Sequence, residues 1–143
     1  MSKEMAVKGS ESMTAASKEE LFKIVLVVFG LTFIFGLYSL TYLWPSGWGW
    51  EATGTLHFHH MHMLYLVYAT LGVFLILAAR DPAEHRSLIA FTAWSSLVHA
   101  AVMGVQAYMD PMERGHFLGD VPALILVAIV LLVLMPSYAR ARQ

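Results

Sequence analysis

The segment HFHHMHM, residues 57–63, carries the densest group of metal-binding and titratable side chains in the sequence. It holds four of the seven histidines and two of the nine methionines. Imidazole nitrogens bind zinc and copper, and nearby thioether sulfurs favour copper(I). Imidazoles also change charge close to neutral pH. The segment therefore predicts either a metal site or a pH-responsive surface.

A second pair with ligand character lies toward the C-terminus, where His116 and Asp120 are spaced i, i+4. On a helix this spacing places both side chains on one face. With His59 and His62, which are three residues apart, the pair forms a candidate site for zinc or copper. No HxxxH pair supports this site. The alternatives are a hydrated, pH-responsive surface and a contact with a partner protein.

A polar stripe runs along residues 92–110 in steps of three and four, which keeps its members on one helix face. Its members are Thr92, Ser96, His99, Met103, Gln106 and Asp110. His99 lies ten residues before Met109, about 15 Å into a membrane. An imidazole at that depth needs a partner, and Thr32, Tyr68 and Thr70 lie at matching depth.

Three roles are open for His99. With Met103 it forms a candidate cofactor-binding pair, haem included. A proton relay is the second possibility, and an interhelical hydrogen bond that only stabilises the fold is the third. A haem with two histidine ligands is poorly supported, because it needs two facing histidines at similar depth and only His99 is deep.

Several acidic residues have the positions of helix caps. The motifs DPAE at 81–84 and DPME at 110–113 each place Asp before Pro and Glu at the third helical position. This arrangement satisfies free backbone N–H groups at a helix start. We expect Asp120, which precedes Val-Pro, to cap the last helix in the same way, and Ser17 with Glu20 to form a capping box for the first span.

The elements that position these residues are predicted to be membrane helices. The chain has 143 residues, 58% of them hydrophobic and 13% charged, and its mean hydropathy is +0.62. A soluble domain carries about 25% charged residues, so lipid must replace water around much of the chain.

The fold class predicted is all-α, an antiparallel four-helix transmembrane bundle within residues 21–139. Its spans are predicted at about 21–43, 61–79, 87–109 and 118–135. Residues 1–20 are predicted to be a mobile cytoplasmic tail, and residues 140–143 a second cytoplasmic tail.

Positive charge predicts the orientation of this bundle. Eight of the nine Lys and Arg residues fall on one side of a four-span topology, and only Arg114 falls on the other. The positive-inside rule then places both termini in the cytoplasm. We expect the protein in a bacterial inner membrane, with residues 57–63 at the periplasmic end.

Composition also excludes several functions. The chain has no cysteine, so it has no disulfide, thiolate metal site or cysteine nucleophile. Its net charge of −1 gives no basic field for nucleic acid. No GxSxG motif or phosphate-binding loop is present, so a hydrolytic enzyme is not supported. An enzymatic role is open only through a bound redox cofactor.

Three stretches carry a resemblance to a known family: LWPSGWGW, the segment containing WSSLVHA, and GHFLGDVPALILVAIVLLVLMP. Over roughly residues 44–137 the chain resembles a bacterial family of small four-span membrane proteins known only as a domain of unknown function. The resemblance implies a four-helix integral membrane protein. It adds weight to His99, His116 and Asp120, which stand inside the matching phrases, and it implies no reaction.

We expect an accessory or binding subunit in a homo-oligomer or a larger membrane complex, with a His/Met-rich polar cluster facing the periplasm. The first alternative is a redox protein that binds copper, zinc or haem through His99 and the histidines of 57–63. The second is a small transporter or proton relay along the third span. Transport is the least favoured, because the polar stripe ends near Thr92 and gives no polar route to the cytoplasm.

Overall fold

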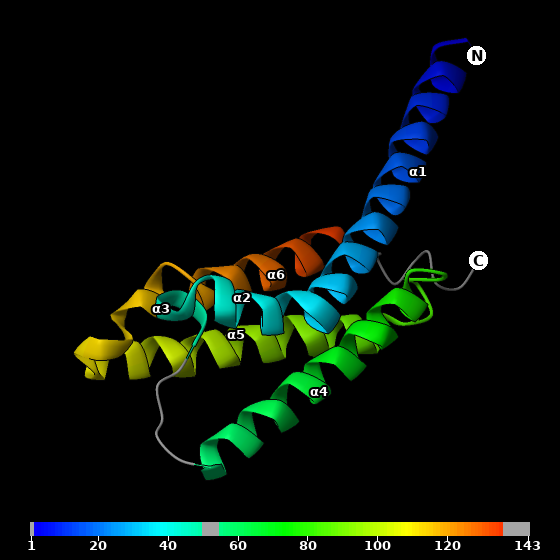
Figure 1. Ribbon diagram of the computed structural model, residues 1–143. Coiled ribbons are helices and arrows are strands. Elements are labelled where there is room, and N and C mark those ends of the chain that lie inside the picture. Colours follow the sequence, from blue (N-terminus) through cyan, green and yellow to red (C-terminus); the bar gives the residue numbers. More distant parts are fainter. Residues whose placement is uncertain (1, 50–54, 136–143) are drawn as a thin grey trace.

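The computed structural model describes residues 2–49 and 55–135, with side chains described in residues 16–49 and 61–135. The elements are α1 (Ser2–Leu31), the π-helical turn η1 (Thr32–Gly36), α2 (Leu37–Leu43), α3 (Pro45–Trp48), α4 (Thr55–Ala78), α5 (Arg86–Met109), the 3-10 helix η2 (Pro111–Phe117) and α6 (Asp120–Leu134) (Figure 1). Within these ranges there is no β-strand, so the predicted all-α class is confirmed.

Four helical stretches are long and apolar enough to cross a membrane, as predicted. They are Ala16–Leu43, Met61–Ala78, Arg86–Met109 and Pro111–Leu134. All four expose large apolar side chains on their outer faces, among them Phe35, Leu66, Val98 and Val133. Contiguous apolar surface of this kind is unfavourable in water and is covered by lipid in a membrane.

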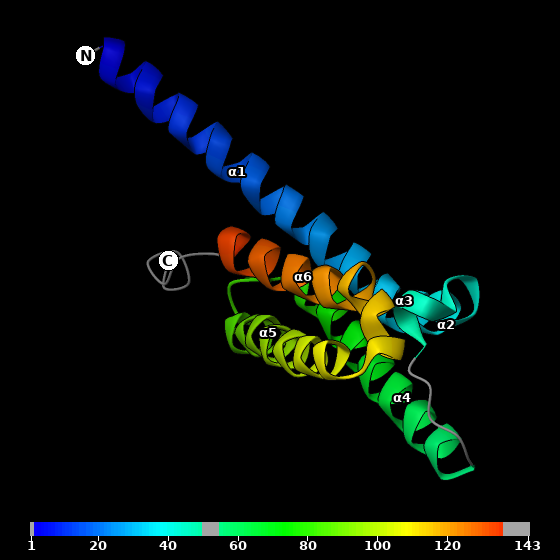
Figure 2. The ribbon, with the colours of Figure 1, turned by 90° about the vertical axis from the view of Figure 1, so that its left-hand side faces the viewer.

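The first helix begins much earlier than predicted. It runs unbroken from Ser2 to Leu31, through the segment predicted to be a mobile tail. Lys, Glu, Ala and Met are frequent in residues 2–20 and have high helix propensity, and extending an existing helix needs no new nucleation. Ser17 thus lies inside the helix, and the predicted capping box is wrong. The mobility of residues 1–20 and their cytoplasmic location stay predictions. In both ribbon views the N-terminal half of α1 projects away from the other helices (Figure 2).

The spans pack as two pairs, α1 with α4 and α5 with α6. The backbones of α1 and α4 approach closely at two glycines: a Cβ added to Gly30 would lie 2.6 Å from the carbonyl oxygen of Gly72. Small side chains of α5, including Ala93 and Ala100, are buried in the bundle. The main core cluster consists of Phe22, Leu26, Phe33, Leu75, Ala79, Ile89, Ala93 and Leu131. α4 diverges from α5 toward the end where α4 begins (Figures 1 and 2).

We call the end of the molecule that carries η2 the η2 end. There the short helix α3 packs directly on η2. A side chain at Gly115 would collide with the carbonyl oxygen of Ser46, and one at Gly119 with the carbonyl oxygen of Gly47. The glycines therefore allow the connection between α2 and α4 to press against the connection between α5 and α6.

The predicted aspartate caps are confirmed at two connections. Asp81 Oδ1 accepts hydrogen bonds from the backbone N–H groups of Ala83 and Glu84, at 3.1 and 3.2 Å. Asp110 Oδ1 accepts one from Met112 N–H at 2.9 Å. The motifs start a turn and a 3-10 helix respectively, because α5 begins only at Arg86 and α6 only at Asp120.

Candidate functional site

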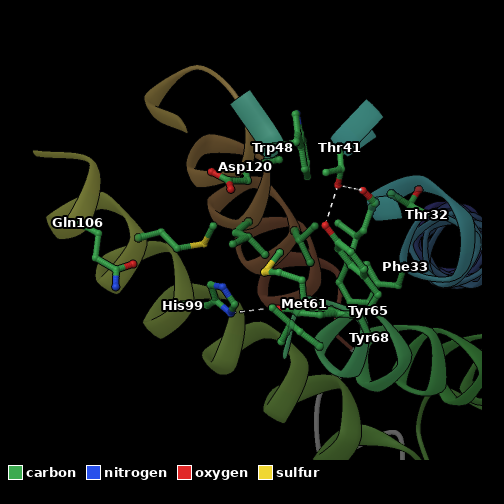
Figure 3. A pocket seen from close by; sticks show the side chains of 16 residues that line it. Thr32, Phe33, Thr41, Trp48, Met61, Tyr65, Tyr68, His99, Gln106 and Asp120 are labelled. Atoms are coloured by element: carbon green, nitrogen blue, oxygen red, sulfur yellow. Dashed lines mark hydrogen bonds between the residues drawn. The ribbon is translucent and has the colours of Figure 1, made fainter. Parts of the chain in front are cut away.

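A cavity of about 260 Å³ lies between the two helix pairs (Figure 3). All four spans and α3 contribute to its wall, and most of the lining is apolar. The lining residues are Thr32, Phe33, Leu37, Thr41, Trp48, Met61, Leu64, Tyr65, Tyr68, His99, Met103, Gln106, Asp120, Ala123, Leu124 and Val127. An apolar cavity with a few convergent polar groups is the usual form of a small-molecule site.

His99 occupies the α5 wall of this cavity and bonds across to α4. Its Nδ1 lies 2.8 Å from the hydroxyl oxygen of Tyr68, as Figure 3 shows. The Tyr68 ring is held in turn by an edge-on contact with Phe33, at 5.3 Å between centroids and 86° between planes. The prediction that a deep histidine finds a hydroxyl partner on another span is confirmed. Phe33 belongs to η1, and π-helical turns of this kind are frequent at functional sites.

Met103 lies one turn beyond His99 on α5, is buried, and lines the same cavity. The structure therefore brings the two predicted cofactor-binding residues to one site. They approach from the same helix face, whereas two axial haem ligands must approach from opposite sides. Among the lining residues whose side chains the structure describes, His99 is the only histidine. Haem binding stays a prediction, and the described residues supply no second axial ligand in the cavity wall.

Other polar groups gather in the half of the cavity near the η2 end. The hydroxyl oxygens of Thr41 and Tyr65 are 2.8 Å apart, which joins α2 to α4. The indole Nε1 of Trp48 is buried and has no hydrogen-bond partner among the residues that the structure describes. A ligand oxygen or water in the cavity is a natural acceptor for this N–H group.

Three ionisable side chains form a buried cluster beside the cavity. His116 Nδ1 lies 2.8 Å from Asp120 Oδ2, and His116 Nε2 lies 3.0 Å from Glu113 Oε2. The side chain of His116 is 1% exposed, that of Asp120 7% and that of Glu113 10%. We call Glu113, His116 and Asp120 the acid–histidine cluster. Asp120 also lines the cavity, so the cluster forms part of the cavity wall.

Two sequence interpretations are corrected by this cluster. Glu113 was expected to serve only the start of a helix, yet it is buried against the imidazole of His116. Asp120 was expected to cap α6, yet the N-cap is Gly119 and the Asp120 carboxylate bonds to His116 instead. The signal for Glu113 was present in the spacing, since residues 113, 116 and 120 share one helix face.

The histidines of the 57–63 segment are placed only in part. His62 lies near the rings of Tyr38 and Tyr65, with centroids 6.1 and 6.3 Å away. The side chain of His59 lies outside the described residues, as do those of His57 and His60. Among described side chains no group of three or more His, Asp or Glu residues has the geometry to hold a metal ion. The proposed metal site of His59, His62, His116 and Asp120 thus stays a prediction, of which the structure shows only the His116–Asp120 pair.

Four apolar spans around a cavity lined mainly by apolar groups define a multi-pass membrane protein. The chain belongs to a family of unknown function (DUF6632), whose model matches residues 16–142. No curated protein and no solved structure matches the chain. The match confirms the resemblance to a family of unknown function, and its bacterial origin stays a prediction. The site has to be interpreted from its own chemistry.

Proposed function

We propose that the protein is a binding subunit that takes up a small amphiphilic molecule within the membrane. The observation that carries the proposal is the cavity of about 260 Å³ between the helix pairs, lined by all four spans. Its size suits a small molecule or the head of a larger one, since drug-sized pockets occupy about 300–1,000 Å³. The hydrogen-bonded pairs Tyr68–His99 and Thr41–Tyr65 fix the positions of its polar groups.

The same proposal includes a location and an orientation. We propose a bacterial inner membrane, an antiparallel bundle and cytoplasmic termini, so that the η2 end faces the periplasm. Lys23 and Arg80, both predicted to be cytoplasmic, lie together around a shallow pocket at the opposite end of the bundle. Arg114 lies on η2 and is exposed. This distribution supports the orientation under the positive-inside rule.

We also propose that the subunit works in a homo-oligomer or a larger membrane complex. Large apolar side chains remain exposed at the η2 end, where Tyr108, Met109, Met112 and Leu118 are each more than 75% exposed. Such a patch is typical of a contact surface. Native mass spectrometry of the protein in mild detergent should show an oligomer or a bound partner, and a bare monomer would contradict this part of the proposal.

Occupancy of the cavity can be tested with a neutral probe, neopentylbenzene. A ligand that binds only the folded protein raises its stability, so the probe should raise the Tm of the wild type. Ala123→Trp places a large side chain in the cavity and should abolish the increase, because Ala123 is a lining residue. Ala101→Trp is the matched control, since Ala101 is exposed on α5 and should leave the increase intact. An equal Tm increase in all three proteins would overturn the proposal.

A further inference from the structure

Three hydroxyl groups of the cavity wall have their protons in hydrogen bonds within the protein. The hydroxyl of Thr32 donates to the carbonyl oxygen of Val28 at 2.9 Å. The hydroxyl of Thr41 donates to the carbonyl oxygen of Leu37 at 3.0 Å, so Tyr65 is the donor in its 2.8 Å contact with Thr41. Because a hydroxyl group has a single proton, none of these three groups has a proton left for a ligand.

The Tyr68–His99 pair differs, because it keeps at least one proton free. A neutral imidazole has one N–H and a phenol has one O–H, and a single 2.8 Å contact joins the Tyr68 hydroxyl to His99 Nδ1. If Tyr68 donates, the imidazole proton is on Nε2 and is free. If Nδ1 donates, the hydroxyl proton of Tyr68 is free. Neither side chain forms another hydrogen bond with the described part of the chain.

This pair lies deep in the wall of the cavity, and Figure 3 shows its hydrogen bond between α5 and α4. His99 is ten residues before Met109, the last residue of α5, which is about 15 Å by helical rise. The ring of Phe33 contacts Tyr68 edge-on, and most of the cavity lining is apolar. An N–H or O–H group without an acceptor is unfavourable at this depth, because hydrocarbon supplies none. A ligand that brings an acceptor to the pair is therefore stabilised there.

The other free side-chain protons of the wall lie nearer the η2 end. The indole N–H of Trp48 has no partner among the described residues, and Trp48 belongs to α3, which packs on η2. The amide of Gln106 lies close to the end of α5, and Gln106 is exposed. At the end of a membrane span water can accept hydrogen bonds from such groups. A ligand acceptor therefore matters most at the Tyr68–His99 pair.

We infer that the ligand of this cavity is a lipophilic carbonyl compound, whose oxygen accepts the free proton of the Tyr68–His99 pair and whose apolar body lies against the rest of the wall. This inference rests on the proposed binding function and specifies its ligand. A carbonyl oxygen only accepts, so it fits both arrangements of the pair, whereas a hydroxyl group would bring a proton that needs a second acceptor. A phospholipid ester and a free carbonyl compound present the same chemistry, so experiment has to separate them.

The test compares two probes of the same carbon skeleton, neopentylbenzene and pivalophenone, in which a carbonyl group replaces the benzylic CH2. Dissociation constants are measured for the full-length protein in neutral detergent, from the dependence of Tm on probe concentration. Because the ketone is the better hydrated probe, proteins are compared by the Kd of neopentylbenzene divided by that of pivalophenone. We call this quotient the ketone ratio. A hydrogen bond contributes about 1 kcal/mol, so loss of the donor should lower the ketone ratio about 5-fold.

Removal of both protons of the pair should cause this loss. The double variant Tyr68→Phe with His99→Leu has neither hydroxyl nor imidazole, and its ketone ratio should fall about 5-fold. Neopentylbenzene should still bind it, which shows that the cavity is formed. Each single variant keeps one proton and should stay within about 2-fold of the wild type. An unchanged ratio in the double variant, or a full loss in both single variants, would overturn the inference.

Three further variants serve as controls. Tyr65→Phe removes a hydroxyl group from the same helix and cavity, but its proton is bonded to Thr41, so the ketone ratio should not change. Tyr68→Phe with His99→Gln restores a donor as a side-chain amide and should recover most of the ratio. A loss in Trp48→Phe and none in the double variant would place the oxygen at the indole and overturn the inference.

The remaining outcomes separate this inference from the proposed function. If both probes bind and the ketone ratio is the same in every protein, the inference fails while the binding function stands. If neither probe binds the wild type, both fail. The source of the carbonyl group is tested in nanodiscs of diester or dialkyl-ether phosphatidylglycerol. Weaker pivalophenone binding in the diester nanodiscs supports the lipid ester as ligand, and equal binding supports a free carbonyl compound.

Discussion

The imidazole Nδ1 of His116 lies 2.8 Å from a carboxylate oxygen of Asp120, and both residues are buried beside the intramembrane cavity. Glu113 contacts the other ring nitrogen, so acid, imidazole and acid follow one another along a single helical face. Burying ionised groups is costly unless each has a partner. The same three side chains therefore contribute to the stability of the η2 end and, through Asp120, to the polar part of the cavity wall.

Removal of the imidazole should destabilise the protein strongly. In His116→Leu two buried carboxylates lose their shared partner, and breaking a buried ion pair costs about 3–5 kcal/mol. Reversible unfolding in mixed SDS micelles measures this change. Arg114→Leu, on the exposed side of the same short helix, is the control and should change the free energy of unfolding by less than about 0.5 kcal/mol. Similar losses in both variants would show that the cluster contributes little.

The contact between α1 and α4 should not tolerate a side chain at Gly30. A Cβ there would lie 2.6 Å from both the Gly72 carbonyl oxygen and Ile76 Cγ1, so Gly30→Ala forces the helices apart. Overpacking of this kind costs about 1–3 kcal/mol. Gly104→Ala is the matched control: its Cβ would meet nothing closer than Val121 Cγ1 at 3.9 Å, and alanine favours a helix by up to about 1 kcal/mol. The same unfolding assay should therefore show opposite signs for the two variants.

Much of the fold could be predicted because hydropathy and helix boundaries are local properties. The third span was predicted at about 87–109, and α5 runs from Arg86 to Met109. The second was predicted to end at 79, and α4 runs from Thr55 to Ala78. Asp81 and Asp110 cap turns as their spacing to proline indicated. The His116–Asp120 pair followed from an i, i+4 spacing in the same way.

The features that were missed depend on tertiary contacts or on competing local signals. Glu113 fitted a helix start, but in the structure it is buried against the imidazole of His116. Asp120 had the position of a cap, but the nearby imidazole of His116 provides a stronger partner than a backbone N–H. The cavity arises because α4 diverges from α5, and no pattern within one helix reports the separation of two helices.

The orientation of the bundle is a prediction that the cysteine-free sequence makes simple to test. Met112→Cys and Glu84→Cys each introduce a single exposed thiol, on η2 and in the connection between α4 and α5. With the termini in the cytoplasm, a membrane-impermeant maleimide added to intact cells should label Met112→Cys only. Glu84→Cys should react once the cells are opened. Labelling of Glu84→Cys in intact cells would show that the bundle has the opposite orientation to the predicted one.

The hydrogen bond between Tyr68 and His99 should couple α4 to α5 energetically. These helices touch little elsewhere, and the 2.8 Å contact spans the cavity wall between them. Tyr68→Phe removes the hydroxyl group and keeps the ring against Phe33, while His99→Leu removes the imidazole. Interhelical hydrogen bonds in membranes show coupling energies of about 0.6–1.7 kcal/mol, so the double variant should lose less stability than the sum of the single variants.

A second double-mutant cycle supplies the control for this coupling. Thr70 lies on the same helix as Tyr68, and its hydroxyl bonds to the carbonyl oxygen of Leu66 within α4, not to α5. Tyr68→Phe combined with Thr70→Val should therefore be additive within about 0.5 kcal/mol. Additivity in the Tyr68–His99 cycle as well would mean that α4 and α5 are joined by packing alone. Coupling confined to the Tyr68–His99 cycle would identify this bond as the polar connection that holds the cavity wall closed between the two helix pairs.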